Sequence, residues 1–89
     1  MIYNIAFGKA YAKSLKKLND KDKMLVREMV ELLANGAEPL PKHKDHALKG
    51  RYLGFRECHV KPDLLLVYRK NNDILELYLL DVGSHSDLF

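Results

Sequence analysis

The sequence predicts an α+β fold with the element order β-α-α-β-β-β, in which two antiparallel N-terminal helices pack on a largely antiparallel sheet. Two changes along the chain lead to this prediction. Apolar residues recur at steps of three and four up to Gly36, whereas after Arg51 they follow the pattern of strands. The polar turns 61–63 and 71–73 then divide the second half into three hairpin-connected strands.

The first half of the chain predicts one strand and two helices. Residues 2–6 form a short apolar strand that Gly8 can end, and the helix after it should end near Leu18. Asn19 or Asp20 is a suitable N-cap for the second helix. The apolar faces of the two helices comprise Phe7, Tyr11, Ser14 or Leu15, and Leu18 in the first, and Val26, Met29, Val30 and Leu33 in the second.

The second helix should stop at Asn35-Gly36, because glycine readily adopts the left-handed conformation that closes a helix. Pro39 and Pro41 then predict an irregular polar loop to about Gly50. The expected strands of the second half are 52–60, 64–70 and 74–82. With 89 residues the chain is expected to be a single domain, 1–89.

Composition narrows the class of protein. The apolar runs are too short for a membrane span, and no secretory signal precedes the first strand, so a cytoplasmic location is expected. The single cysteine, Cys58, cannot form an internal disulfide and is read as a small strand residue. The net charge is +3, and the basic surplus lies in the first half. Four lysines of the first half recur at helical spacing and form a stripe: Lys9, Lys13, Lys16 and Lys17. This stripe either contacts a nucleic-acid backbone or is an ordinary solvated face of a helix.

Three histidines, His46, His59 and His85, lie among polar residues outside the apolar runs. Imidazole is the side chain that exchanges protons most readily near neutral pH. Cleavage of RNA without a metal needs a base for the 2′-hydroxyl, a cation for the phosphate and an acid for the leaving 5′-oxygen. The chain contains side chains for all three roles.

His59 and Asp63 flank a proline turn and are expected to face each other across the mouth of a hairpin; alternatively, Asp63 caps the turn through its own backbone. His85 lies in a polar terminal segment that is either a frayed end or a docked one. Phe89 favours docking, because a terminal aromatic can pack on the sheet or stack on a base.

Arg56 is the candidate phosphate ligand, with Lys49 near the same sheet edge. Arg56 and His59 are three residues apart, so on a regular strand they point to opposite faces, and a bulge or a strong twist is needed to bring them together. Otherwise Arg56 is expected to pair with Glu57 or Asp63 in a structural role. His43 and His46 form only a weak metal motif, and His43 is read as a surface residue.

Three segments together closely resemble the YafQ branch of the RelE/ParE toxin superfamily. These are Asp45-His46-x-Leu48-x-Gly50, Gly54-Phe55-Arg56-x-x-His59-Val60-x-Pro62-Asp63 and Gly83-Ser84-His85-Ser86-x-Leu88-Phe89. The resemblance covers essentially the whole chain, although residues 1–36 match only as a helical hairpin.

The resemblance implies a bacterial type II toxin that cleaves messenger RNA, typically in the ribosomal A site, without a cofactor or a metal. It implies His85 as the general acid, His46, His59 and Asp63 as the other active-site residues, and Phe89 as a supporting aromatic. Arg56 matches a basic position near the phosphate.

The resemblance further implies a cognate antitoxin protein as partner, with operator DNA bound only through the antitoxin complex. Tyr52 replaces a tryptophan that is frequent in relatives. Two alternatives remain open at this point: a non-catalytic ParE-like toxin that binds a protein such as gyrase, and an RNA-binding module that does not cut.

Overall fold

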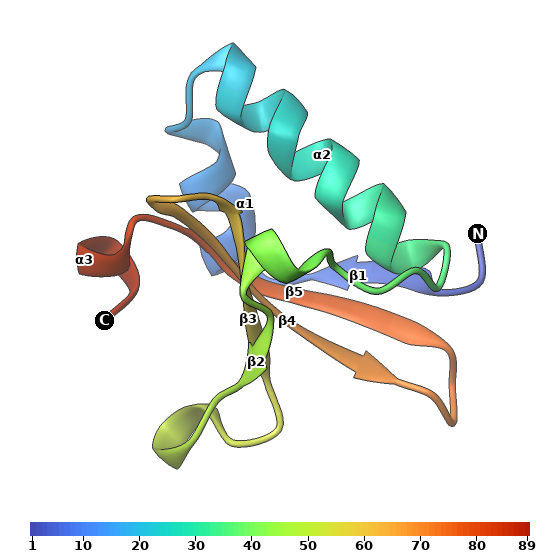
Figure 1. Cartoon of the computed structure of the whole chain (residues 1–89). Coiled ribbons are helices and arrows are strands. Elements are labelled where there is room, and N and C mark those ends of the chain that lie inside the picture. Colours follow the sequence, from blue (N-terminus) through green and yellow to red (C-terminus); the bar gives the residue numbers. More distant parts are fainter.

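The structure, a computed structural model, describes all residues 1–89 and contains one five-stranded sheet (Figure 1). The strands lie in the order β1-β5-β4-β3-β2, in which β1 pairs parallel with β5 and every other pairing is antiparallel. The predicted α+β architecture is therefore confirmed. The bounds of the strands are β1 Asn4–Phe7, β2 His46–Ala47, β3 Arg56–Lys61, β4 Leu64–Asn71 and β5 Glu76–Gly83.

Helices α1 (Lys9–Lys16) and α2 (Asp20–Ala34) bury their apolar faces against the sheet (Figure 1). Of the two candidate N-caps the structure uses Asn19, whose side-chain oxygen accepts a hydrogen bond from the backbone N–H of Asp22 at 2.8 Å. Gly36 has a φ of 86°, as a helix-ending glycine requires. No helix is long and apolar enough to cross a membrane.

Two faces of the sheet differ in what covers them. The main core contains Cys58, Leu66 and Tyr68 together with the buried residues of α1 and α2. Because side chains alternate along a strand, Glu57 and His59 point to the opposite side. We call this side the distal face; on it lie Glu57, His59, Leu65 and Val67.

Several boundaries differ from the sequence-based prediction. Helix α1 ends at Lys16, two residues early, because the backbone N–H groups of Lys17 and Leu18 form the tighter i to i−3 bonds that end a helix. The expected irregular loop contains a short 3₁₀ turn, η1 (Pro41–His43), and the two-residue strand β2. A second 3₁₀ turn, η2 (Gly50–Tyr52), and a turn replace the beginning of the expected strand 52–60, so β3 begins at Arg56.

The third expected strand begins two residues late because Leu75 adopts a left-handed conformation, with a φ of 50°, and its side chain is exposed. The C-terminal segment also differs from a simple tail. It forms a short helix, α3 (His85–Leu88), which Ser84 and Asp87 close with a reciprocal capping box.

Candidate active site

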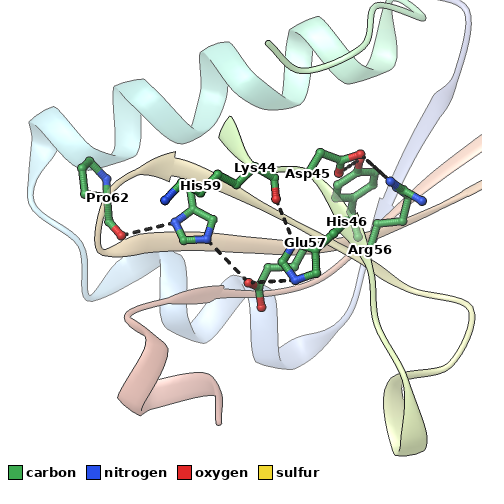
Figure 2. Close-up of polar contacts among 8 residues, drawn as sticks. Lys44, Asp45, His46, Arg56, Glu57, His59 and Pro62 are labelled. Atoms are coloured by element: carbon green, nitrogen blue, oxygen red, sulfur yellow. Dashed lines mark hydrogen bonds and ion pairs between the residues drawn. The ribbon is translucent and has the colours of Figure 1, made fainter. Parts of the chain in front are cut away.

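Two of the predicted histidines meet at a carboxylate, Glu57, on the distal face (Figure 2). The Nε2 atom of His46 lies 3.6 Å from Oε1 of Glu57, and the Nε2 atom of His59 lies 3.8 Å from the same oxygen. The pairing of the strands explains this meeting. His46 on β2 is directly opposite Glu57 on β3, and His59 follows Glu57 by two residues on the same face.

Backbone carbonyls orient both rings. The Nδ1 atom of His46 lies 2.8 Å from the carbonyl oxygen of Lys44, and Nδ1 of His59 lies 3.3 Å from that of Pro62 (Figure 2). A carbonyl only accepts hydrogen bonds, so each Nδ1 must carry a proton to donate. Each ring therefore presents its other nitrogen, Nε2, to Glu57, and a proton held at either Nε2 faces the same carboxylate oxygen.

Glu57 is only 5% exposed, although carboxylates are rarely buried without partners. A carboxylate between two imidazoles can hold a positive charge on either ring and fix the ring orientation, which is the role that acid/base chemistry requires of an orienting group. Sequence reasoning missed Glu57. The signal was present, because Glu57 and His59 are two residues apart and so share a face of any strand that contains both.

A bulge between His59 and Lys61 interrupts the pairing of β3 with β4. Beside it, Nδ1 of His43 donates a hydrogen bond of 2.8 Å to the carbonyl oxygen of His59. The interpretation of His43 as a surface residue is therefore wrong. Its half-buried ring attaches the loop after α2 to the end of β3, next to the predicted catalytic histidine.

The C-terminal helix α3 carries His85 and Phe89 as an ordered unit. The ring centroids of His85 and Phe89 are 5.4 Å apart, and Phe89 meets Tyr52 edge to face with centroids 5.5 Å apart. These contacts hold the end of the chain in place. Phe89 and Tyr52 also line a pocket with Val67, a residue of the distal face.

Strand register relates α3 to the two histidines. His59 pairs with Leu65, and Leu65 pairs in turn with Gly83 at the end of β5. His59 and Gly83 are therefore two strands apart, which places their Cα atoms at a distance of about 10 Å. His85 follows two residues later. In Figure 2 the side chain of Glu57 points away from α2, toward the side of the sheet on which α3 lies.

Two predicted site residues have no partner in the structure. Asp63 lies exposed in the turn between β3 and β4, and its carboxylate makes neither an ion pair with His59 nor a hydrogen bond that caps the turn. Lys49 is exposed just before η2 and makes no ion pair. Both side chains are free to meet a bound molecule.

Arg56 is turned away from the histidines. The bulge in β3 falls after His59 and not between the two residues, so Arg56 keeps the opposite face. Its Nε and Nη2 atoms donate to Oδ2 of Asp45 at 2.9 and 2.8 Å (Figure 2). The hydroxyl of Tyr68 donates to the other oxygen of the same carboxylate. The structure thus brings Arg56 to Asp45 and not to His59, and the expected pairing with Glu57 or Asp63 is wrong.

Burial and charge shift several pKa values behind the site. The hydrogen bond from Arg56 to Asp45 raises the pKa of the guanidinium. Burial, followed by the bond to Asp45, raises the pKa of the Tyr68 hydroxyl. Burial raises the pKa of the Cys58 thiol to about 12, with smaller contributions from the negative charges of Asp45 and Glu57. All three groups therefore keep their protons at neutral pH.

No group of three or more histidine, cysteine, aspartate or glutamate side chains is placed to hold a metal ion. The two histidines and the carboxylate on the distal face are side chains that can exchange protons. The model of one protein family matches residues 3–89, and that family is described as the bacterial toxin of a type II toxin-antitoxin system, YafQ.

The chain belongs to the YafQ toxin family. Among curated relatives, the mRNA interferase toxin YafQ of Escherichia coli K12 is 34% identical over 89 residues, covering 97% of this chain and 95% of the relative. Among solved structures, a metal-bound toxin from Helicobacter pylori is 42% identical, with a TM-score of 0.83 and full coverage of both chains. YafQ in the E. coli DinJ-YafQ toxin-antitoxin complex is 30% identical, with a TM-score of 0.85, over 100% of this chain and 99% of the other.

Proposed function

We propose that this YafQ-family toxin is an mRNA interferase, an endoribonuclease that cuts messenger RNA by acid/base attack of the 2′-hydroxyl on the adjacent phosphate. The observation that supports this most directly is the meeting of His46 and His59 at Glu57 on a face that also carries the C-terminal helix. The E. coli relative that is 34% identical is itself named an mRNA interferase.

His59 and His85 carry out the two proton transfers of the reaction, one as the base and the other as the acid. His59, oriented by Pro62 and Glu57, takes the proton of the 2′-hydroxyl at Nε2, and His46 exchanges protons with the same carboxylate. The oxygen then attacks phosphorus, a 2′,3′-cyclic phosphate forms and the bond to the 5′-oxygen breaks. His85 on α3 protonates that leaving oxygen, and Phe89 supports its ring. Asp63 is exposed in the turn after His59, where its carboxylate can accept a hydrogen bond from the substrate or from a water molecule bound with it.

The partners follow from the same proposal. The substrate is messenger RNA undergoing translation, and the exposed lysines of α1 are available to meet the ribosome. A cognate antitoxin protein neutralises the toxin, as the DinJ-YafQ complex of the E. coli relative suggests. Operator DNA is bound only through that toxin-antitoxin complex.

The substitution His85→Ala tests the proposal. Loss of a general acid lowers the cleavage rate by a factor of about 10² to 10⁴. The exposed ring of His85 contacts only Phe89 among the aromatic side chains, so thermal unfolding should change little. Both forms are expressed in bacteria, and the 5′ ends of cellular transcripts are mapped.

Ser86→Ala, an exposed neighbour without a side-chain hydrogen bond, serves as the matched control and should cut like the parent protein. Undiminished cleavage by the His85→Ala protein contradicts the assignment of the general acid. Growth arrest by the parent protein with intact transcripts and halted DNA replication contradicts the nuclease itself and favours a toxin that binds a protein target.

A further inference from the structure

A basic pocket adjoins His59 near the end of β3. It has a volume of about 390 Å³ and lies between the η1 loop and the turn that follows β3. Five of its seven lining residues are lysines or histidines, and none is acidic. The lining residues are Lys42, His43, Lys44, His59, Val60, Lys61 and Pro62.

The cations of the pocket differ in how free they are. Lys61 forms an ion pair of 2.8 Å with Asp22 of α2, so its charge is already balanced. Lys42 and Lys44 are exposed and make no ion pair. The pocket therefore holds two ammonium groups that have no anionic partner within the chain, in a concave setting where charges of one sign attract an anion.

The loop that carries these lysines is held in a defined position. His43, between them, donates to the carbonyl oxygen of His59. Lys44 adopts a left-handed conformation with a φ of 47°, which non-glycine residues seldom adopt, and its carbonyl oxygen accepts from the ring of His46. Residues 42–44, which include the two lysines, are thus attached to both histidines of the candidate active site by these two hydrogen bonds.

We propose that this pocket binds a backbone phosphate of the RNA strand next to the one that is cut. This inference rests on the proposed function, because His59 belongs both to the pocket and to the group around Glu57. An RNA strand whose reactive phosphate lies at His59 carries its neighbouring phosphate toward Lys42 and Lys44. Lysine supplies the positive charge for such a contact without reading the base.

The chemistry of the lining favours RNA over a protein partner. Val60 is the one hydrophobic residue of the pocket, and it is 9% exposed. Protein interfaces depend on apolar or aromatic anchors that fill pockets, and this pocket offers such an anchor little surface. The pocket also supplies the phosphate-binding cation that Arg56, held by Asp45, does not supply.

The double substitution Lys42→Gln/Lys44→Gln tests the pocket. It is made in the His85→Ala protein so that RNA remains uncut, and binding of a short single-stranded RNA is measured by fluorescence anisotropy between 50 and 300 mM salt, roughly the range in which phosphate contacts dominate affinity. Two lost contacts should lower the salt slope by about 1.4 and weaken binding about 25-fold at roughly 0.1 M salt. Unchanged thermal unfolding shows that the fold is retained.

Lys23→Gln/Arg27→Gln is the matched control, because it removes two cations that line a separate groove between α1 and α2 and changes the net charge equally. The proposal expects it to leave the salt slope within experimental error. An unchanged slope for the pocket variant, an equal decrease for both variants, or an absence of salt-dependent RNA binding by the parent overturns it. Loss of antitoxin binding with retained RNA binding also overturns it, in favour of a protein ligand.

Transcript mapping distinguishes an error in the phosphate site from an error in the proposed function. If the protein with His85 intact cuts messenger RNA but the pocket substitutions leave both binding and cleavage unchanged, only the phosphate site is wrong. If that protein cuts no RNA, the proposed function itself is wrong.

Discussion

The substitution Asp45→Ala should strongly destabilise the protein. Asp45 accepts two hydrogen bonds from Arg56 and one from Tyr68, and its side chain is 12% exposed. The Arg56 side chain is 44% exposed, so solvent reduces its share to about 1 kcal/mol. The hydroxyl of Tyr68 is buried, and leaving it without an acceptor costs about 2 kcal/mol.

The total loss is therefore about 3 kcal/mol, a large fraction of the roughly 4 to 13 kcal/mol that stabilises a chain of this length. A loss of this size should lower the melting temperature by about 12 to 24 °C. Urea unfolding followed by circular dichroism gives the free energy directly, and a thermal scan gives the shift.

Tyr68→Phe is the matched variant, because it removes the donor that Asp45→Ala leaves unsatisfied. Combining the two substitutions should cost about 1 kcal/mol less than the sum of the separate losses, since a missing donor no longer needs an acceptor. A loss below 1 kcal/mol for Asp45→Ala, or strict additivity in the double variant, would refute the account of Asp45 as the shared acceptor.

Three further predictions concern the residues around Asp45 and the distal face. Arg56→Gln should cost about 1 kcal/mol in urea unfolding yet leave the salt slope of RNA binding unchanged; a lower slope would restore Arg56 as a phosphate ligand. Glu57→Gln should reduce the initial rate of messenger RNA cleavage at least about 10²-fold, because neither His46 nor His59 then faces a charged carboxylate; a rate near that of the parent would remove Glu57 from the site. The thiol of Cys58 should resist disulfide reagents at pH 8 until urea unfolds the protein, because its pKa is about 12. The pKa of the Cys58 thiol is higher in the folded than in the unfolded protein, so ionisation of this thiol does not reduce the free energy of unfolding below about pH 9. Above about pH 9 the free energy of unfolding should fall by about 1.4 kcal/mol per pH unit on account of this group, and Cys58→Ala should reduce that slope.

Local signals in the sequence predicted much of the fold. Asn19 and Gly36 mark the ends of α2 through their own backbone preferences, which depend on few neighbours. The change in the spacing of apolar residues, from helical before Gly36 to alternating after Arg51, predicts the positions of the three long strands. Strand β2 was not predicted, because its two residues pair with β3 only after the chain between them folds back through η2.

The candidate site was harder to predict for the same reason. Alternation along β3 already implied that Arg56 and His59 point apart, and the structure agrees because the bulge lies beyond His59. The pairing of His46 with Glu57 depends on register between distant segments, which composition and spacing do not determine. The identity of the acceptor of Arg56 depends equally on where the loop before β2 places Asp45.

The parallel pairing of β1 with β5 constrains when the toxin becomes active. Asn4 pairs with Glu76, so the first strand finds its neighbour only after more than two thirds of the chain has been made. Contacts between such distant segments form late in folding. His85 and Phe89, which complete the proposed catalytic face, follow β5 in the chain and are made after it. The proposed catalytic face therefore cannot assemble before β5 and the residues after it have been made, and a product truncated before Glu76 lacks both the strand that pairs with β1 and the proposed acid.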